Sequence, residues 1–165
     1  MQKRIAVIFV SRRNSLRSIL AEACLAHLDP KRFSAYSCGQ PGQLAHEFHP
    51  AAVGALKSAS MELPSHAPRS WDEFARSSSP AADFIITLDA ATEPLHPPWP
   101  GQPDAALWAY PDVAAGTDNN EATAHAAVQM LFSLRRRLEL LVSLPMQGVD
   151  RAAVRSDVRD LGYMR

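Results

Sequence analysis

A continuous run of apolar residues, Ile5 to Val10 (IAVIFV), lies close to the start of the chain. Because no polar residue interrupts it and branched side chains dominate, the run predicts a strand covered on both faces, as in a parallel sheet. A polar segment follows at once. Apolar residues at helical spacing then occupy Ser18 to Leu28, and Asp29-Pro30 predicts the end of that helix. The chain therefore begins with a strand, a polar turn and a helix.

The same alternation continues to the end of the chain. Further strands are expected over Phe33 to Cys38, Asp83 to Leu88 and Ala106 to Ala109. Further helices are expected from His49-Pro50 to about Ala59, from Ser70, from Asn119 and in the tail from Asp150. This order predicts an α/β fold, a three-layer doubly wound open sheet of about four parallel strands with helices on both faces. Ligands bind such sheets at the carboxyl ends of the strands.

Size and composition fit one globular domain. The chain has 165 residues, of which 47% are hydrophobic and 21% charged. Lys plus Arg and Asp plus Glu both total 17, which gives no reason to expect nucleic acid or a membrane surface as partner. No run approaches the length of about 18 apolar residues that a membrane helix needs, and the basic, apolar start is too short for a signal peptide. We therefore expect a cytoplasmic protein.

The polar segment from Ser11 to Ser18 is a candidate anion site. Backbone N–H groups at a helix amino terminus lack helical partners and can bind an anion. Arg17, at the end of the segment, can add a bidentate contact to an oxyanion. The residues alone leave a second interpretation open, because Ser, Asn and Arg at such turns often serve only to cap the helix.

A family resemblance favours the first interpretation. VIFVSRRNSLRSILAEA resembles the phosphate-binding loop of the low-molecular-weight protein tyrosine phosphatases and the related thioredoxin-coupled arsenate reductases, whose pattern is C-x-x-N-x-C-R-S between a strand and a helix. Asn14, Arg17 and Ser18 match that pattern, whereas Ser11 stands where the family has its nucleophilic cysteine. Further stretches that resemble the family are Tyr36 to Gly39, His49 to Val53, His66 to Phe74, Pro97 to Gly101, Trp108 to Asp112, and Gly116-Thr117.

The resemblance implies a fold and a site. The fold is that of the phosphotyrosine phosphatase I type, in one domain over residues 1–165, with a core over 1–143 and a C-terminal extension over 144–165 like that of bacterial arsenate-reductase relatives. The implied ligand is phosphate, sulfate or a phosphorylated molecule, with neither a cofactor nor a metal; a protein partner and a homodimer stay open. The implied catalytic positions are Ser11, Arg17 and Asp112, and the implied oxyanion-binding residues are Ser11, Arg12, Arg13, Asn14, Ser15, Leu16, Arg17 and Ser18.

Ser11 is the departure with the largest chemical consequence. A thiol is readily deprotonated at a helix amino terminus beside an Arg, whereas a serine hydroxyl needs an adjacent general base. The resemblance places no base there, so we expect a catalytically impaired protein that can still bind an oxyanion. Two alternatives stay open: an active phosphatase, by a serine route or with Cys as the natural residue 11, and an interaction module of the same fold that uses the proline-rich loop from Pro94 to Pro103.

Further departures concern the loop and the thiols. Arg13 stands where the family has Gly, which predicts either strain from a positive φ or a different loop conformation. Leu16 stands where the family often has a second loop cysteine, and replacing a small apolar side chain with a larger one is a mild change. Asp89 and His96 follow the third strand, where the arsenate reductases carry further thiols, so a thiol relay is excluded. Together these departures favour natural degeneration over an engineered Cys-to-Ser change.

The remaining polar and aromatic residues have simpler expected roles. Cys24 and Cys38, too few for a disulfide framework or a zinc site, are expected to pack as small hydrophobes. Asp112 is expected to overhang the anion loop, and Glu22 to be a helix-surface or capping charge. Trp108 and Tyr110 either wall the cleft or belong to the core or its rim. The run Arg135-Arg136-Arg137 is expected on a solvated helix face, and the proline-rich loop at the ligand end.

Overall fold

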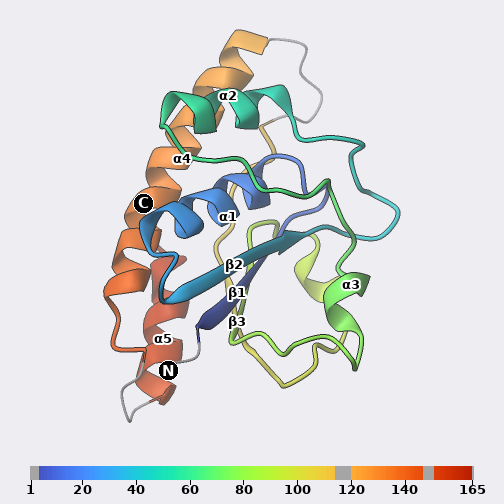
Figure 1. Ribbon diagram of the computed structural model, residues 1–165, viewed down its shortest axis with the longest axis vertical. Coiled ribbons are helices and arrows are strands. Elements are labelled where there is room, and N and C mark those ends of the chain that lie inside the picture. Colours follow the sequence, from blue (N-terminus) through green and yellow to red (C-terminus); the bar gives the residue numbers. More distant parts are fainter. Residues whose placement is uncertain (1–3, 114–119, 147–150, 165) are drawn as a thin grey trace.

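The computed structural model describes residues 4–113, 120–146 and 151–164. Four strands form one parallel sheet in the order β2-β1-β3-β4, of which Figure 1 labels the first three. The strands are β1 (Ile5–Val10), β2 (Phe33–Cys38), β3 (Phe84–Thr87) and β4 (Asp104–Leu107). The helices are α1 (Arg17–Leu28), α2 (Pro50–Ser58), α3 (Asp72–Ala75), the short 3-10 helix η1 (Glu93–Leu95), α4 (Asn120–Ser143) and α5 (Arg151–Leu161).

The predicted elements are present, with one clear shift. β1 and β2 have the predicted bounds, and β3 is one residue shorter at each end. The fourth strand, predicted over Ala106 to Ala109, instead spans Asp104–Leu107, because the Asp104 amide donates to the Asp83 carbonyl at 3.0 Å and starts the pairing with β3 earlier. The predicted helix starts at Asn119 and Asp150, and the Gly116-Thr117 match, lie outside the described residues.

The strand register brings the candidate site together. β1 lies between β2 and β3, and Val10 pairs with Cys38 on one side and with Thr87 on the other. The three carboxyl ends therefore meet at one edge of the sheet. The chain reverses its direction of winding between β1 and β3, which is where open α/β sheets bind ligands.

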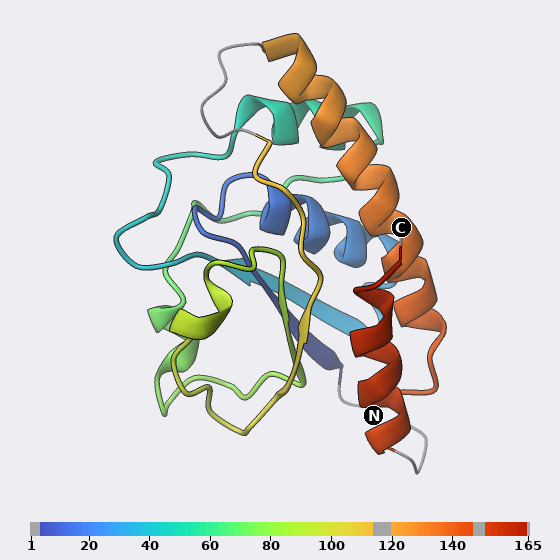
Figure 2. The same cartoon turned by 180° about the vertical axis from the view of Figure 1, so that it is seen from behind.

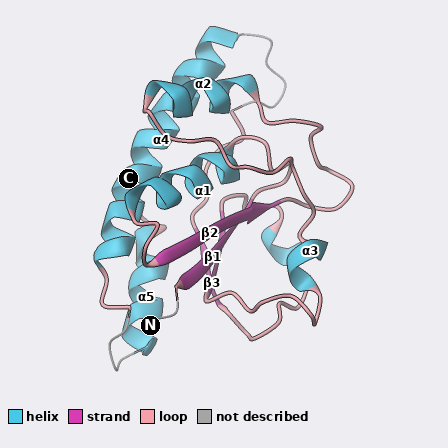
Figure 3. Ribbon diagram, viewed as in Figure 1, coloured by secondary structure: helices cyan, strands magenta, loops and turns pink. Residues whose placement is uncertain are grey.

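The two faces of the sheet are covered unequally. One face packs Val7, Phe9 and Ile86 against the main core, to which α1, α2, α4 and α5 contribute; Figure 2 shows α4 and α5 from behind. The other face, with Ile8 and Ile85, is covered by the short helix α3 and by loops (Figure 3). The predicted three-layer doubly wound fold is thus confirmed, with a thin second layer.

The proline-rich loop belongs to this second layer. Its Trp99 packs against the core of that face, and the His96 ring lies between Trp71 and Trp99, with centroid distances of 5.3 and 5.6 Å. The start of this loop lies at the ligand end, as expected, because His96 Nε2 is 3.4 Å from Oγ1 of Thr87, the last residue of β3. The aromatic side chains draw the loop onto apolar sheet residues that no long helix covers.

Trp108 fixes the C-terminal helix to the end of β4. The indole is fully buried, and its Nε1–H donates to the Val158 carbonyl of α5 at 2.9 Å. Of the two roles left open for Trp108, the structure therefore shows the core position. Gly162, just after α5, packs so closely on the Leu107 carbonyl that a Cβ would collide with it.

Among the described residues, no helix has the length and hydropathy needed to cross a bilayer.

Candidate anion-binding site

The loop between β1 and α1 presents backbone donors that have no protein partner. Within the described part of the chain, no hydrogen bond joins the N–H groups of residues 12–16 to another protein group. The loop is nonetheless well enclosed, with Asn14 fully buried and Leu16 5% exposed. Leu16 is the N-cap of α1 and offers no side-chain cap. Unpaired N–H groups in such a place attract an anion, which the positive end of the helix also favours.

A neighbouring segment holds the loop through its carbonyl groups. Backbone N–H groups of Gln40, Ala45 and His49 donate to the carbonyls of residues 12, 13 and 15 at 2.9, 3.1 and 2.9 Å. These bonds fix three peptide planes of the loop from one side. The arrangement is therefore built before any ligand binds.

The left-handed residue of the loop is Asn14 and not Arg13. Asn14 has φ 52°, whereas Arg13 is absent from the described residues with positive φ. Of the two alternatives for Arg13, strain from a positive φ is therefore excluded, because the loop places its left-handed turn at a residue type that tolerates it. The Asn14 amide Nδ2 donates to Ser18 Oγ and Ser37 Oγ at 2.8 and 2.9 Å, and its Oδ1 accepts from the Arg69 amide at 3.0 Å.

Ser11 is buried at the start of the loop. Its side chain donates to Ser18 Oγ at 2.7 Å. Ser18 Oγ also accepts from Asn14, so the Ser11 hydroxyl hydrogen is directed to a second hydroxyl group. This contact orients Ser11 without providing a group that could take up its proton.

Glu22 extends this polar network into the interior. The residue is only 7% exposed, accepts a short hydrogen bond from Ser37 Oγ, and lies 2.8 Å from His66 Nε2. The expected surface or capping role of Glu22 is therefore wrong. Burial opposes protonation of His66, but the hydrogen bonds to Glu22 and to the Ala67 carbonyl outweigh it, so the His66 pKa is raised.

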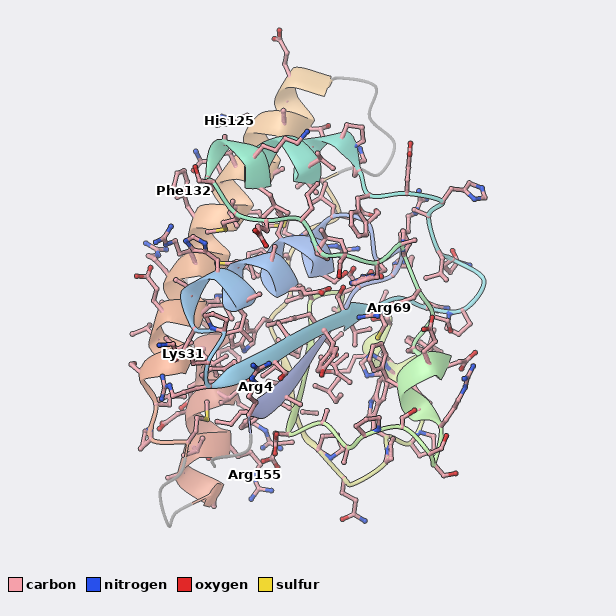
Figure 4. All side chains as sticks on the ribbon, viewed as in Figure 1. Arg4, Lys31, Arg69, His125, Phe132 and Arg155 are labelled. Carbon is pink, nitrogen blue, oxygen red and sulfur yellow. The ribbon has the colours of Figure 1, made fainter. Side chains whose placement is uncertain are left out.

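Arg69 closes the network at the end of β2, where Figure 4 labels it. Its Nε donates to the Ser37 carbonyl at 3.0 Å, and its guanidinium lies 4.8 Å from the centre of the Phe74 ring. Arg69 thereby ties β2 and α3 to the Asn14 turn.

Arg17 is the central cation of the site. Its side chain is 7% exposed, and its Nη2 lies 3.0 Å from Asp89 Oδ2 and 3.9 Å from Asp112 Oδ2. Its Nη1 donates to the Tyr110 carbonyl at 3.1 Å. The guanidinium is thus held at two nitrogens, with Asp112 at the rim and Asp89 from the end of β3 beneath it.

A cleft of about 410 Å³ opens over the loop. Of the predicted oxyanion-binding residues, Ser11, Arg13, Ser15, Leu16 and Arg17 line it, together with Asp112. The other three are not in its lining: Asn14 and Ser18 are buried behind the loop, and Arg12 Nε lies 3.5 Å from Asp89. Tyr110 does not line the cleft but packs at the rim of the core, which decides between the two roles that the sequence left open.

The opposite wall comes from residues that the sequence analysis did not predict to be part of the site. His46, Glu47, Phe48 and His49 line the cleft. The amide of Ala51 donates to His49 Nδ1 at 3.0 Å, so this histidine caps α2 and its Nε2 carries the proton when the ring is neutral. The position of His49 directly before a helix that begins with Pro was the feature of the sequence that could have predicted this cap.

Both cysteines lie away from the cleft and are buried. Burial raises the pKa of Cys24 to about 12, and burial also raises that of Cys38. The expected packing role is confirmed for both.

Comparisons with known proteins identify the family and the fold of this chain. The sequence model of the family described as low molecular weight phosphotyrosine protein phosphatase matches residues 6–99. No curated protein matches the chain.

Solved structures give the same fold. An arsenate reductase from Archaeoglobus fulgidus is 22% identical with a TM-score of 0.64, over 84% of this chain and 99% of its own. An arsenate reductase in the phosphate binding state is 22% identical with a TM-score of 0.66, over 84% and 97%. The tyrosine phosphatase Wzb from Escherichia coli K30, in complex with sulphate, is 18% identical with a TM-score of 0.63, over 84% and 99%.

Proposed function

This chain belongs to the low molecular weight phosphotyrosine protein phosphatase family, and from that premise we propose that it binds phosphate, sulfate or a phosphorylated ligand at the loop from Ser11 to Ser18 and is catalytically impaired. The ligand's oxygens would lie at the N–H groups of residues 12–16 and beside the Arg17 guanidinium. The structural relatives solved with phosphate and with sulphate support an oxyanion as the ligand.

One observation carries the binding proposal. The N–H groups of residues 12–16 have no protein partner in the described chain, and the guanidinium of Arg17 lies buried beside them. Successive N–H groups that lack a protein acceptor can donate to one anion together, and the anion then satisfies several of them at once. The site is therefore better suited to an oxyanion than to a neutral ligand.

The hydroxyl contact of Ser11 supports the impairment. Attack on phosphorus by Ser11 would require a base to accept its proton, but the proton is directed at Ser18 Oγ. His49 lines the same cleft, yet its Nδ1 already accepts from the Ala51 amide. Without a covalent step, a general acid at Asp112 has no leaving group to protonate. Ser11 and Asp112 then serve only to shape the cleft and set its charge.

The binding proposal is tested by thermal unfolding and calorimetric titration with phosphate, sulfate and arsenate up to on the order of 10 mM. We expect phosphate or sulfate to raise the unfolding temperature of the natural sequence. Arg17→Ala should weaken binding by about 1.5–3 kcal/mol, because it removes a charged contact. Arg135→Ala, a change at an arginine of α4 that pairs with Glu139 at the surface, is the control. An unchanged unfolding temperature with all three anions would instead favour the interaction module.

The impairment is tested separately by hydrolysis of p-nitrophenyl phosphate. The protein with Ser11 should show no turnover above that of Arg17→Ala. Strong turnover that depends on Ser11 would overturn the impairment while leaving the binding proposal intact.

A further inference from the structure

Arg137 is a buried cation on the long helix α4. The sequence placed it on a solvated face with Arg135 and Arg136, but it is only 6% exposed, which corrects that expectation. Its Nη2 donates to the Met164 carbonyl at 2.6 Å, in the segment after α5 that runs back along α4 (Figure 2). Its Nε and Nη1 have no hydrogen-bond partner among the described residues.

An aromatic ring also stabilises this charge. The Arg137 guanidinium carbon lies 4.8 Å from the centre of the Tyr110 ring. A cation over an aromatic face is attracted by the ring's quadrupole, most strongly where water is excluded. Because two nitrogens of the Arg137 guanidinium have no hydrogen-bond partner among the described residues, its contact with the Tyr110 ring is important for keeping the guanidinium and the ring in place. The position of the ring is thus tied to the position of the cation.

Tyr110 passes this restraint to the anion site. Its carbonyl accepts from Arg17 Nη1 at 3.1 Å, its hydroxyl lies 2.8 Å from Ser133 Oγ, and its amide donates to the Leu88 carbonyl at 3.0 Å. Arg17 is therefore fixed on one side by Asp89 and on the other by a residue whose ring rests on Arg137.

We propose that Arg137 is a positioning residue of the anion site: through the Tyr110 ring and carbonyl it holds the Arg17 guanidinium in the orientation that receives an oxyanion. This inference rests on the proposed function. It gives the α4–α5 side of the molecule a role in ligand affinity, although Arg137 does not line the cleft.

The first test measures phosphate affinity in Arg137→Met, with Arg135→Met as the matched control on the same helix, where Arg135 pairs with Glu139 at the surface. We expect a loss of roughly tenfold for Arg137→Met, within the range of a desolvated cation–π contact, and none for Arg135→Met. In an Arg17→Ala background, Arg137→Met should cause no further loss, because its effect passes through Arg17. Arg137→Lys should restore part of the affinity. An additive loss in the double variant would overturn the proposal.

The second test reads Arg17 directly and does not need a ligand. In the natural protein, a guanidinium held at two nitrogens should rotate slowly and give separate Nη signals in the NMR spectrum. Arg137→Met should merge the Arg17 signals while the rest of the spectrum shows a folded protein. Unchanged Arg17 signals would overturn the inference.

The two tests separate the proposals. If the natural protein binds no phosphate, the proposed function fails, and the NMR result alone decides whether Arg137 positions Arg17. If Arg137→Met does not fold, Tyr110→Leu, which removes the ring and keeps the carbonyl, is measured in the same two ways. Retained affinity and unchanged Arg17 signals in that variant would also overturn the inference.

Discussion

Arg17 Nη2 lies 3.0 Å from Asp89 Oδ2, and this buried ion pair joins the loop after β1 to the residues after β3. The two residues are 72 positions apart in the sequence. Asp89 Oδ1 also accepts from the Ala91 amide at 2.9 Å, so the carboxylate is fixed from its own strand end. Asp89 thus acts as an internal anion beside the cation that is proposed to bind an external one.

Asp89→Asn should change stability and phosphate affinity in opposite directions. Removing Asp89 leaves the buried guanidinium beside the more distant Asp112 carboxylate, at 3.9 Å, and we expect a loss of about 3 kcal/mol in the free energy of unfolding. The same guanidinium, with less of its charge balanced, should bind phosphate more tightly. Urea unfolding with and without phosphate checks both effects. Phosphate should stabilise the variant more than the natural protein; an equal or smaller stabilisation would contradict the prediction.

Ser11→Cys should create hydrolysis of p-nitrophenyl phosphate. A thiol at a helix amino terminus beside Arg17 has a lowered pKa and needs no separate base. Ser11→Ala is the matched control and should bind phosphate without turnover. If turnover requires Arg13→Gly in addition, the loop itself has drifted. No turnover in either cysteine variant would show that the rest of the site cannot support the reaction.

The pair of His66 and Glu22 should make stability depend on pH. The folded-state pKa of His66 is raised above its ordinary value of 6.5, so protonated His66 stabilises the fold fully below about pH 6.5, and this contribution is lost as pH rises through the folded-state pKa. We expect the natural protein to exceed His66→Gln in stability at about pH 5.5 and the difference to shrink by about pH 9. Urea unfolding of both proteins across this pH range measures the difference in their free energy of unfolding. A difference that stays constant would refute the coupling.

His49 should stabilise α2 through its cap. His49→Ala removes the acceptor of the Ala51 amide and should lower the free energy of unfolding by about 1 kcal/mol. His49→Asn keeps a capping acceptor and should recover most of that loss. His46→Ala, at an exposed position of the same wall, is the control and should have little effect. Equal stability of the Ala and Asn variants would show that the cap contributes nothing.

Cys24 and Cys38 should resist alkylation in the folded protein. Both are fully buried, and the Cys24 pKa of about 12 leaves almost no thiolate near neutral pH. Iodoacetamide labelling followed by mass spectrometry should modify neither residue until denaturant is added. Rapid labelling of either thiol in the native state would reopen a redox role.

The parts that could be predicted from sequence are those that local pattern decides. The apolar run before Ser11 identified β1, and the polar residues ending in Arg17 identified the loop and the start of α1. Likewise, the Pro at the start of α2 was sufficient to place that helix. In each case neighbours in the sequence supply the physical cause.

The parts that could not be predicted depend on partners far along the chain. Glu22 can be buried because its carboxylate is hydrogen-bonded to His66 and Ser37, and His66 is 44 residues away. Arg137 looks like its two neighbours in sequence, and only the packing of Tyr110 and the Met164 carbonyl around it makes it different. Asn14, in turn, takes the left-handed turn where its side chain hydrogen-bonds to Ser37 Oγ and the Arg69 amide, 23 and 55 residues away.

The central place of β1 also sets the order in which the site can form. β2 follows β1 after a single helix, so the unit from Ile5 to Cys38 needs only a short loop closure. β3 reaches β1 across a much longer stretch of chain, and such distant pairing is slower. During synthesis the loop and Arg17 leave the ribosome well before Asp89 does. A nascent chain that stops short of β3 therefore carries the Arg17 cation before Asp89, its ion-pair partner in the finished fold, has been made.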